Sequence, residues 1–297
     1  MKLRTMLCSL LSILCLLTAC GGDKKGGGIR VGSKDFTENL IVAEVYALAL
    51  EDAGYKVERK LNIAGSVVHM AITNNEIDLY PEYTTTGLLT ILKLDLITDP
   101  QKVYDVVKDE YNKRFKITWL DQTKANDSQG LVMRTDTANS LNIHAISDLQ
   151  KQADKIRFAS QGEFDQRDDG IPVLEKVYGK FNFKSSKVYD NGIKYQILKN
   201  GDADAAPAYT TEGQLVKTDV FTLLEDDKHA WQPYYLVPIV RNNVLEAHPG
   251  IAKVLNKVSA TFDSAVITKL NAKVDVDKME YEEVAKKYFQ SIKPLLK

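Results

Sequence analysis

Cysteine is scarce in this sequence of 297 residues, and its three occurrences all lie within the first twenty positions. Cys8 and Cys15 fall inside an N-terminal apolar run, and Cys20 directly follows that run. If the run is removed on export, the remaining chain has no thiol except the one at its own N-terminus. Disulfides, cysteine-based zinc sites and cysteine nucleophiles are therefore excluded for the exported chain.

Histidine is also rare, and its four residues show neither the spacing of a metal site nor a position beside a nucleophilic serine. They are His69, His144, His229 and His248. The chain lacks a Walker motif and a Gly-x-Gly-x-x-Gly fingerprint. A basic stripe with interleaved aromatic residues, which is typical of nucleic-acid binding, is absent as well. We therefore expect no catalytic residue, no cofactor, no metal and no nucleic-acid partner.

Residues 1–19 have the features of a secretory signal. Lys2 and Arg4 provide positive charge, an apolar run follows, and the sequence Leu-Thr-Ala-Cys that ends at Cys20 is typical of a lipoprotein cleavage site. The apolar run is shorter than the roughly 20 residues that span a bilayer. We therefore predict an extracytoplasmic chain that is anchored to the bacterial cell membrane by acyl chains on Cys20. The glycine-rich residues 20–28 would form a flexible tether.

A repeat is the most informative pattern in the chain. The segment NNEIDLYPEYTTTG at 74–87 returns as NGDADAAPAYTTEG at 200–213, which is 126 positions later without a gap. A second echo relates IRVGS at 29–33 to IRFAS at 156–160, at an offset of 127. Because the two offsets agree within one residue, the chain holds two related units.

Strands and helices are expected to alternate in both units. In the first unit we expect strands at 29–31, 55–61 and 77–79, a helix capped by Thr37 that runs to Gly54, and a helix at 67–73. In the second unit we expect helices at 170–178 and 195–199 and a strand at 186–189. Such alternation predicts an α/β fold in which each unit has a mainly parallel sheet flanked by helices.

The C-terminal part of the chain is expected to return to the first unit. A strand at 236–241 is followed by helices at 249–262, 263–270 and 278–296. The second unit is then inserted into the first. We predict a first lobe of residues 29–125 and 235–297, a second lobe of residues 126–234, and two crossover hinge segments near 124–126 and 231–235, with a cleft between the lobes.

The repeat places a tyrosine at equivalent strand ends in the two units, Tyr83 and Tyr209. Ligands of doubly wound sheets bind beyond the carboxyl ends of the strands. We expect the two rings to face each other across the cleft, where they could hold an alkylated cation by cation–π attraction. The alternative is that both are half-buried core residues.

Two basic residues precede expected helices, Lys34 before the helix at Thr37 and Arg167 before the helix at 170–178. Backbone N–H groups and the helix dipole favour an anion at such positions. Both side chains are therefore candidates for holding a carboxylate or phosphate. The alternatives are a solvated surface lysine for Lys34 and a structural salt bridge with its acidic neighbours for Arg167.

Three segments together carry a family resemblance: GSKDFTE at 32–38, DLYPEYTTTG at 78–87 and QPY at 232–234. They resemble the glycine betaine/carnitine/choline-binding proteins of osmoprotectant ABC importers, over essentially the whole mature chain. The resemblance implies a two-lobed periplasmic-binding-protein fold, type II-like, that closes around a quaternary ammonium solute. It also implies a membrane permease and an ATPase as partners, and we expect the binding protein itself to be a monomer.

The resemblance further implies an aromatic box around the trimethylammonium group. By motif, Tyr83, Tyr209 and Tyr234 fall on box positions and Asp127 on a position near the cation. Gln129 stands where several relatives have a further box tyrosine. Its amide could hydrogen-bond a hydroxyl or carbonyl group, which suits carnitine or another functionalised betaine.

The same resemblance places Lys34, Thr86 and Arg167 where the carboxylate of the ligand is held. Choline has no carboxylate, so these positions favour a betaine over choline. One alternative is a receptor for ordinary amino acids, in which Asp127 would pair with the α-ammonium group. The other is an exported transferase that uses the same cleft for chemistry.

Overall fold

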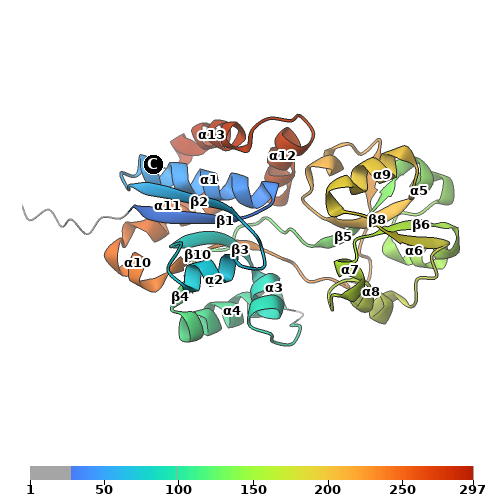
Figure 1. The fold of residues 1–297 in the computed structure, drawn as a ribbon, viewed down its shortest axis with the longest axis horizontal. Helices are drawn as coiled ribbons and strands as arrows, with labels where there is room; N and C mark the ends of the chain where they lie inside the picture. Colours follow the sequence, from blue (N-terminus) through green and yellow to red (C-terminus); the bar gives the residue numbers. More distant parts are fainter. Residues whose placement is uncertain (1–27, 98, 297) are drawn as a thin grey trace, which may run out of the picture.

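The computed structural model describes residues 28–97 and 99–296. The predicted signal segment, Cys20 and the tether up to residue 27 therefore lie outside the described residues. The described chain forms two lobes that lie end to end and are joined by extended segments (Figure 1). The C-terminal helices return to the first lobe.

Each lobe is built on one five-stranded sheet within the described residues. The first sheet has the order β2-β1-β3-β10-β4 and the second has the order β7-β6-β8-β5-β9. The strands of the first sheet are β1 (Ile29–Lys34), β2 (Val57–Ile63), β3 (Leu79–Tyr83), β4 (Ile117–Trp119) and β10 (Leu236–Arg241). Those of the second sheet are β5 (Gln129–Arg134), β6 (Arg157–Ser160), β7 (Ser185–Val188), β8 (Ala205–Tyr209) and β9 (Phe221–Leu223).

Both sheets are mixed, with one reversed strand in the same place. In the first lobe β1 is parallel to β2 and β3, whereas β10 is antiparallel to β3 and β4. In the second lobe β5 is antiparallel to β8 and β9. Because β5 and β10 are the first strands after a crossing between lobes, each enters its sheet from the end that faces the other lobe. The prediction of a two-lobed α/β fold is confirmed. The sheets were predicted to be mainly parallel, and each contains one antiparallel strand, β10 or β5.

Helices cover both faces of each sheet (Figure 1). The first lobe has α1 (Thr37–Asp52), α2 (Val68–Thr73), α3 (Thr84–Thr86), the π-helical turn η1 (Gly87–Ile91), α4 (Pro100–Phe115), α10 (Asn242–Ala247), α11 (Gly250–Ser259), α12 (Ser264–Asp275), α13 (Tyr281–Ile292) and the 3₁₀ turn η5 (Lys293–Leu296). The second lobe has α5 (Thr135–Leu141), α6 (Ile146–Lys151), α7 (Glu163–Gln166), α8 (Ile171–Tyr178), α9 (Lys194–Asn200) and the 3₁₀ turns η2 (Ala153–Lys155), η3 (Asn191–Ile193) and η4 (Gly213–Val216).

The start of α1 differs from the prediction. Phe36, not Thr37, occupies the N-cap position, and its backbone is extended. The Thr37 hydroxyl instead donates a hydrogen bond of 2.7 Å to Asp275 at the end of α12. A contact between distant segments thus replaces the local cap that the sequence favours.

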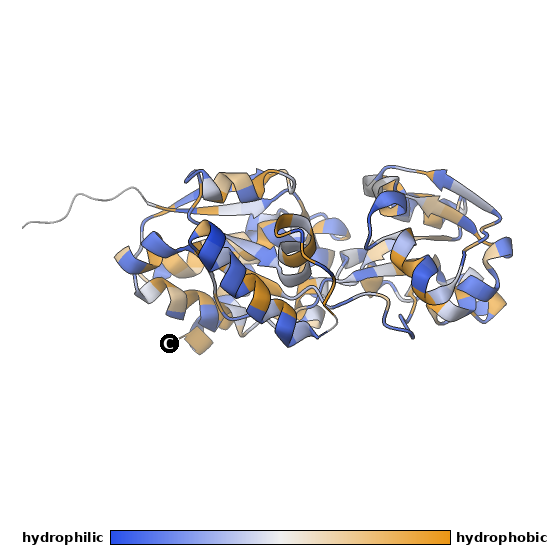
Figure 2. Cartoon of the chain, turned by 90° about the horizontal axis from the view of Figure 1, so that it is seen from below, coloured by the Kyte–Doolittle hydropathy of each residue, from blue (hydrophilic) through white to orange (hydrophobic). Residues whose placement is uncertain are grey.

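The sheet of the first lobe is buried on both faces, as is usual for sheets covered by helices. Leu79 and Tyr83 of β3 belong to the core formed with α1, α11 and α13, whereas Tyr80 belongs to the core formed with α2 and α4. The helices show alternating hydrophobic and hydrophilic stripes (Figure 2). Burial of each such large side chain contributes about 1.5–3 kcal/mol, so β3 is held firmly and its end is a rigid place for a site.

The two crossing segments pair with each other between the lobes. Asn126 and Tyr235 form an isolated antiparallel bridge, and the Asp127 amide donates 3.1 Å to the Tyr234 carbonyl. The Asn126 side chain also accepts from the Tyr234 amide at 2.7 Å. This pairing supports the predicted lobe boundaries at residues 126 and 235, which stay a prediction.

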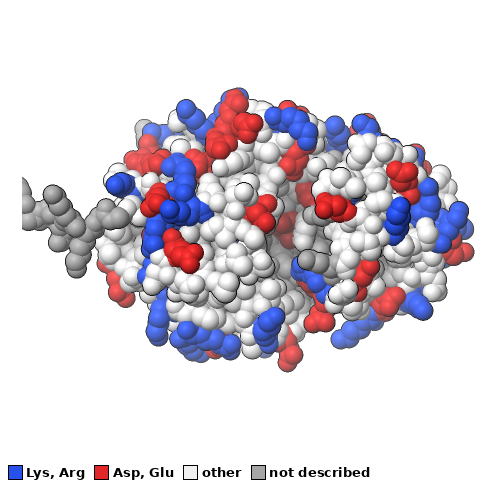
Figure 3. Space-filling view, viewed as in Figure 1, with Lys and Arg blue, Asp and Glu red and all other residues white. Residues whose placement is uncertain are grey.

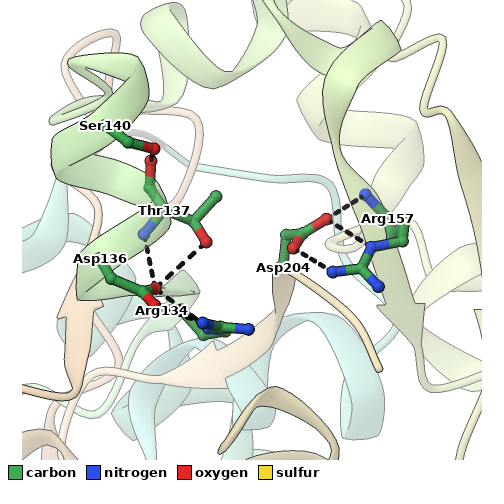
Figure 4. A network of polar contacts seen from close by, with 6 residues as sticks. All are labelled: Arg134, Asp136, Thr137, Ser140, Arg157 and Asp204. Atoms are coloured by element: carbon green, nitrogen blue, oxygen red, sulfur yellow. Dashed lines mark hydrogen bonds and ion pairs between the residues drawn. The ribbon is translucent and has the colours of Figure 1, made fainter. Parts of the chain in front are cut away.

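The repeat extends to an ion pair at the start of the central strand of each lobe. Asp78, just before β3, accepts from the Arg30 backbone at 2.8 Å and its guanidinium at 2.6 Å. Asp204, just before β8, accepts from the Arg157 backbone at 2.9 Å and its guanidinium at 2.6 Å (Figure 4). The two aspartates fix the same strand in both lobes, and thereby place Tyr83 and Tyr209 at equivalent positions.

Candidate functional site

Tyr83 and Tyr209 are the last residues of β3 and β8, at the ends that face the junction of the lobes. Tyr83 is buried and stacks against Phe36 at a centroid distance of 6.1 Å, with the ring planes inclined by 30°. Tyr209 is half-buried and pairs in register with Gln129 of β5. The predicted strand-end position of both rings is therefore observed, while their role in binding stays a prediction.

A first carboxyl centre joins the two lobes around Glu38, in the first turn of α1. Glu38 is buried and accepts a hydrogen bond of 2.7 Å from the Tyr83 hydroxyl. Its second oxygen lies 2.6 Å from the hydroxyl of Thr211, which follows β8 in the other lobe. The same Thr211 hydroxyl lies 2.6 Å from Asp127 in the first crossing segment. Asn271 of α12 completes the centre with a contact of 3.3 Å to Glu38.

Both acids of this centre hold protons more tightly than free side chains do. Burial, and then the negative charge of Glu38, raise the pKa of Asp127 well above its usual range. Burial also raises the pKa of Glu38, against the hydrogen bonds from Thr211, Tyr83 and Asn271. A positive group placed here would balance the negative charge that these acids carry when they ionise.

A second carboxyl centre is formed by Asp169, between α7 and α8. Its carboxylate accepts from Arg167 at 2.7 and 2.6 Å, and from the Tyr234 hydroxyl at 2.5 Å. The Gln129 amide lies 3.5 Å from the same carboxylate, and the indole of Trp231 donates to the Asp169 backbone carbonyl at 2.8 Å. Burial acts to raise the pKa of Asp169, but the hydrogen bonds and charge of Arg167 hold it below its usual range.

Tyr209 is affected electrostatically by charged residues of both centres. Burial raises the pKa of its hydroxyl, the charge of Arg167 lowers it, and the charges of Asp127, Glu212 and Asp169 raise it further. Among the described residues its hydroxyl has no hydrogen-bond partner, in contrast to those of Tyr83 and Tyr234. Its ring is therefore positioned by packing rather than by its hydroxyl.

Lys34 has a more specific environment than its sequence position indicates. It is the last residue of β1, is only 6% exposed, and forms an ion pair with Glu82, which is 1% exposed. Tyr80 donates to the other oxygen of Glu82 at 2.8 Å. The ammonium group lies 5.1 Å from the centre of the Tyr83 ring. The alternative of a solvated surface lysine is thus wrong, and the lysine already has a carboxylate partner within the protein.

The second lobe also has a lysine, a glutamate and a tyrosine in contact, but at positions that the sequence repeat does not relate to Lys34, Glu82 and Tyr80. Lys194 pairs with Glu212, and Tyr195 donates to the same glutamate. The Lys194 ammonium lies 5.9 Å from the centre of the Tyr209 ring. Glu212 stands where the first lobe has Thr86, and Thr86 itself is half-buried in α3. Each of the two strand-end tyrosines thus has a paired lysine of its own lobe near its ring.

Sequence reasoning missed three residues that organise the junction: Glu38, Thr211 and Asp169. Glu38 lies inside the segment 32–38 that carries the resemblance, and Thr211 is the echo of Thr85, so position alone could have marked both. Asp169 entered the sequence analysis only as one of the unnamed acidic neighbours of Arg167. The salt bridge that we kept as an alternative for Arg167 is observed, and its partner is Asp169.

The surface is hollowed between the lobes, and acidic and basic groups are visible in the hollow (Figure 3). Acidic, aromatic and basic side chains from both lobes and from the crossing segments meet at this junction. Two covalent links between two α/β lobes, with polar and aromatic side chains meeting at the junction, are the architecture of two-lobed solute-binding proteins, a class whose lobes close around a ligand.

Similarity to known proteins identifies the family of this chain. Residues 27–291 match the family described as the substrate binding domain of ABC-type glycine betaine transport systems, and the chain belongs to this family. The chain is 31% identical over 280 residues to the carnitine transport binding protein OpuCC of Listeria monocytogenes, covering 93% of this chain and 90% of that protein. It is 30% identical over 291 residues to a glycine-betaine-binding protein of Pseudomonas aeruginosa, covering 93% and 92%.

A solved structure agrees with the fold. The crystal structure titled glycine betaine/carnitine/choline ABC transporter superposes with a TM-score of 0.81 at 24% identity, covering 90% of this chain and 99% of that chain. This confirms the two-lobed fold of substrate-binding proteins. The matched family and relatives are solute-binding proteins of transporters rather than enzymes.

The described residues add two observations about the rest of the chain. Among residues 28–97 and 99–296, no helix is both long enough and apolar enough to cross a bilayer. The same residues contain no group of three or more His, Cys, Asp or Glu side chains placed to hold a metal ion. Lipidation of Cys20 lies outside the described residues and stays a prediction.

Proposed function

We propose that this chain is the extracytoplasmic, lipid-anchored binding protein of an ABC importer for a carboxylate-bearing quaternary ammonium solute, such as glycine betaine or carnitine. The observation that carries the proposal is the junction of the lobes, where Tyr83 of the first lobe donates to Glu38 and Tyr209 of the second lobe is affected by the charge of Asp127. The names of the relatives from L. monocytogenes and P. aeruginosa agree with this ligand class.

The ammonium group of the ligand would lie near Tyr83, Tyr209 and Tyr234, with Asp127 beside it. A quaternary ammonium group has no N–H to donate, so it is held by ring faces and by negative charge. The Gln129 amide would contact a polar group of the ligand from β5. This arrangement suits a permanent cation better than a primary ammonium group, which needs acceptors for each of its hydrogens.

The carboxylate of the ligand would interact with Arg167, Thr86 and Lys34. Arg167 donates to Asp169 through Nε and Nη2, and its Nη1 is the group that we expect to reach the ligand. Lys34 would act mainly through its charge, because its ammonium group is paired with Glu82. We expect the protein to act as a monomer that delivers the ligand to a permease driven by an ATPase.

Substitution of Tyr209 tests the aromatic part of the proposal. Tyr209→Ala should weaken glycine betaine binding by about 1–2 kcal/mol, or roughly 5- to 30-fold, because one ring face is lost. Tyr209→Phe should retain most of the affinity, because the ring and not the hydroxyl makes the contact. Isothermal titration calorimetry of the two variants measures the difference.

A tyrosine far from the junction provides the control. Tyr55 lies at the other end of the first sheet, packed edge-on against His248, so Tyr55→Ala should leave the affinity unchanged. Equal losses for Tyr209→Phe and Tyr209→Ala would show that the ring face is not the binding group, and the box would have to be abandoned.

A further inference from the structure

Thr211 lies between two buried carboxyl groups that come from different parts of the chain. Its hydroxyl oxygen is 2.6 Å from Glu38 Oε2 and 2.6 Å from Asp127 Oδ1. A threonine hydroxyl has one hydrogen to donate and two lone pairs that accept. It can donate to only one of the two carboxyl groups, so the other short contact requires a hydrogen on the carboxyl side.

The remaining contacts decide which carboxyl group carries that hydrogen. Glu38 accepts from the Tyr83 hydroxyl at 2.7 Å and from the Asn271 amide at 3.3 Å, in addition to Thr211. Donors of this kind stabilise an ionised carboxylate. The Asp127 carboxyl group contacts a single residue among the described residues, Thr211, through its hydroxyl and its backbone N–H. The hydrogen therefore belongs on Asp127, which donates to Thr211, and Thr211 donates to Glu38.

The other charged groups around the pair do not neutralise it. Tyr83 of β3 and Glu212 after β8 act on the pair, and Tyr209 of β8 is affected by the charge of Asp127. Lys34 of β1 lies over the Tyr83 ring and Lys194 of α9 over the Tyr209 ring. Lys34 is paired with Glu82 and Lys194 with Glu212. Burial and the repulsion between the two acids raise the pKa of Asp127, in agreement with the position of the hydrogen.

We propose that a proton on Asp127 and the ammonium group of a ligand are alternative partners of the same Glu38–Asp127 pair, so that binding of a permanent cation releases one proton to the solvent. The inference rests on the proposed function for the nature of the ligand. In this proposal Glu38 is part of the cation site, and the Thr211 hydroxyl connects Glu38 of the first lobe to Asp127.

The sign of the pH dependence follows from this competition. A raised pKa means that the pair keeps its proton above the usual range of an aspartate, and in that interval the proton opposes binding of the cation. Affinity for glycine betaine should therefore rise with pH through this interval and level off once Asp127 has ionised. The carboxylate of glycine betaine stays ionised above about pH 5 and does not contribute to the trend.

The test is calorimetry with glycine betaine at about pH 5, 6.5 and 8, in buffers of different ionisation heat. While Asp127 keeps its proton, the affinity of the wild type should rise by up to about tenfold per pH unit, with release of about one proton per ligand. Asp127→Asn places an amide donor where the protonated acid stood. It should fold normally, bind more weakly, and lose both the proton release and the pH dependence.

Asp169→Asn is the matched control. The pKa of Asp169 is lowered, so this acid is ionised throughout the range, and its variant should bind more weakly yet keep the pH dependence. A wild-type affinity independent of pH, or proton release that persists in Asp127→Asn, would overturn the inference. Absence of betaine binding at every pH would contradict the proposed function itself and the inference with it.

Discussion

Lys34→Ala should lower the free energy of unfolding of the first lobe by about 3–5 kcal/mol, the usual cost of leaving one member of a buried ion pair alone. The substitution removes the partner of Glu82, whose side chain is 1% exposed. The remaining carboxylate would keep its bond from Tyr80 but would have no positive charge beside it. Urea denaturation followed by linear extrapolation measures the change.

An exposed ion pair of the same lobe is the control for this substitution. Lys60 and Glu58 form a pair in which both side chains are about half exposed, at 48% and 49%. Lys60→Ala should therefore change the stability by less than about 1 kcal/mol. If Lys34→Ala lowered the free energy of unfolding no more than Lys60→Ala, the Lys34–Glu82 pair would not stabilise the lobe. Lys34 would then be free to bind the carboxylate of a ligand directly.

Gly213→Ala should weaken glycine betaine binding by roughly 10- to 100-fold, because it obstructs the contact between the lobes. A Cβ atom at Gly213 in η4 would lie 2.5 Å from the Ala272 backbone nitrogen and 2.6 Å from the Asn271 carbonyl carbon in α12. Backbone atoms cannot give way as a flexible side chain does, so the lobes must shift apart. Such overpacking costs about 1–3 kcal/mol, and this cost falls on the closed arrangement that holds the ligand.

The affinity of Gly213→Ala is measured by calorimetry, and its unfolding by denaturation as above. Gly65→Ala is the control, since the nearest atom to its added Cβ would be an Asp35 side-chain oxygen at 4.0 Å. We expect Gly65→Ala to bind normally. Unchanged affinity in Gly213→Ala would mean that the contact of η4 with α12 is not needed for ligand binding.

The repeat in the sequence was sufficient to predict the two-lobed fold and the strand ends at which we propose the site. Its constant offset predicted two related units, and the structure shows why the offset is maintained, since Asp78 and Asp204 bind Arg30 and Arg157 in the same way. Strand ends could be located because a buried strand shows a continuous apolar run followed by polar residues. The strand-end positions of Tyr83 and Tyr209 were therefore predicted from the sequence alone.

The partners of the site residues could not be predicted, because they come from distant segments. Glu38 meets Thr211, which is 173 positions away, only when the lobes are brought together. The pairing of Lys34 with Glu82 depends on the adjacency of β1 and β3 in the sheet. Sequence spacing carries no direct record of such contacts, whereas the contact of Arg167 with Asp169, two residues apart, could be kept as an alternative.

The most direct test of the account is the choice of ligand. Calorimetric titration of the exported chain with glycine betaine, carnitine, choline, glycine and arginine separates the ligand classes by methylation and by carboxylate. The account predicts that glycine betaine or carnitine binds at least about tenfold more tightly than choline, and that glycine and arginine bind far more weakly. Tight binding of an unmethylated amino acid, with no binding of any betaine, would contradict it and would assign Glu38 and Asp127 to a primary ammonium group instead.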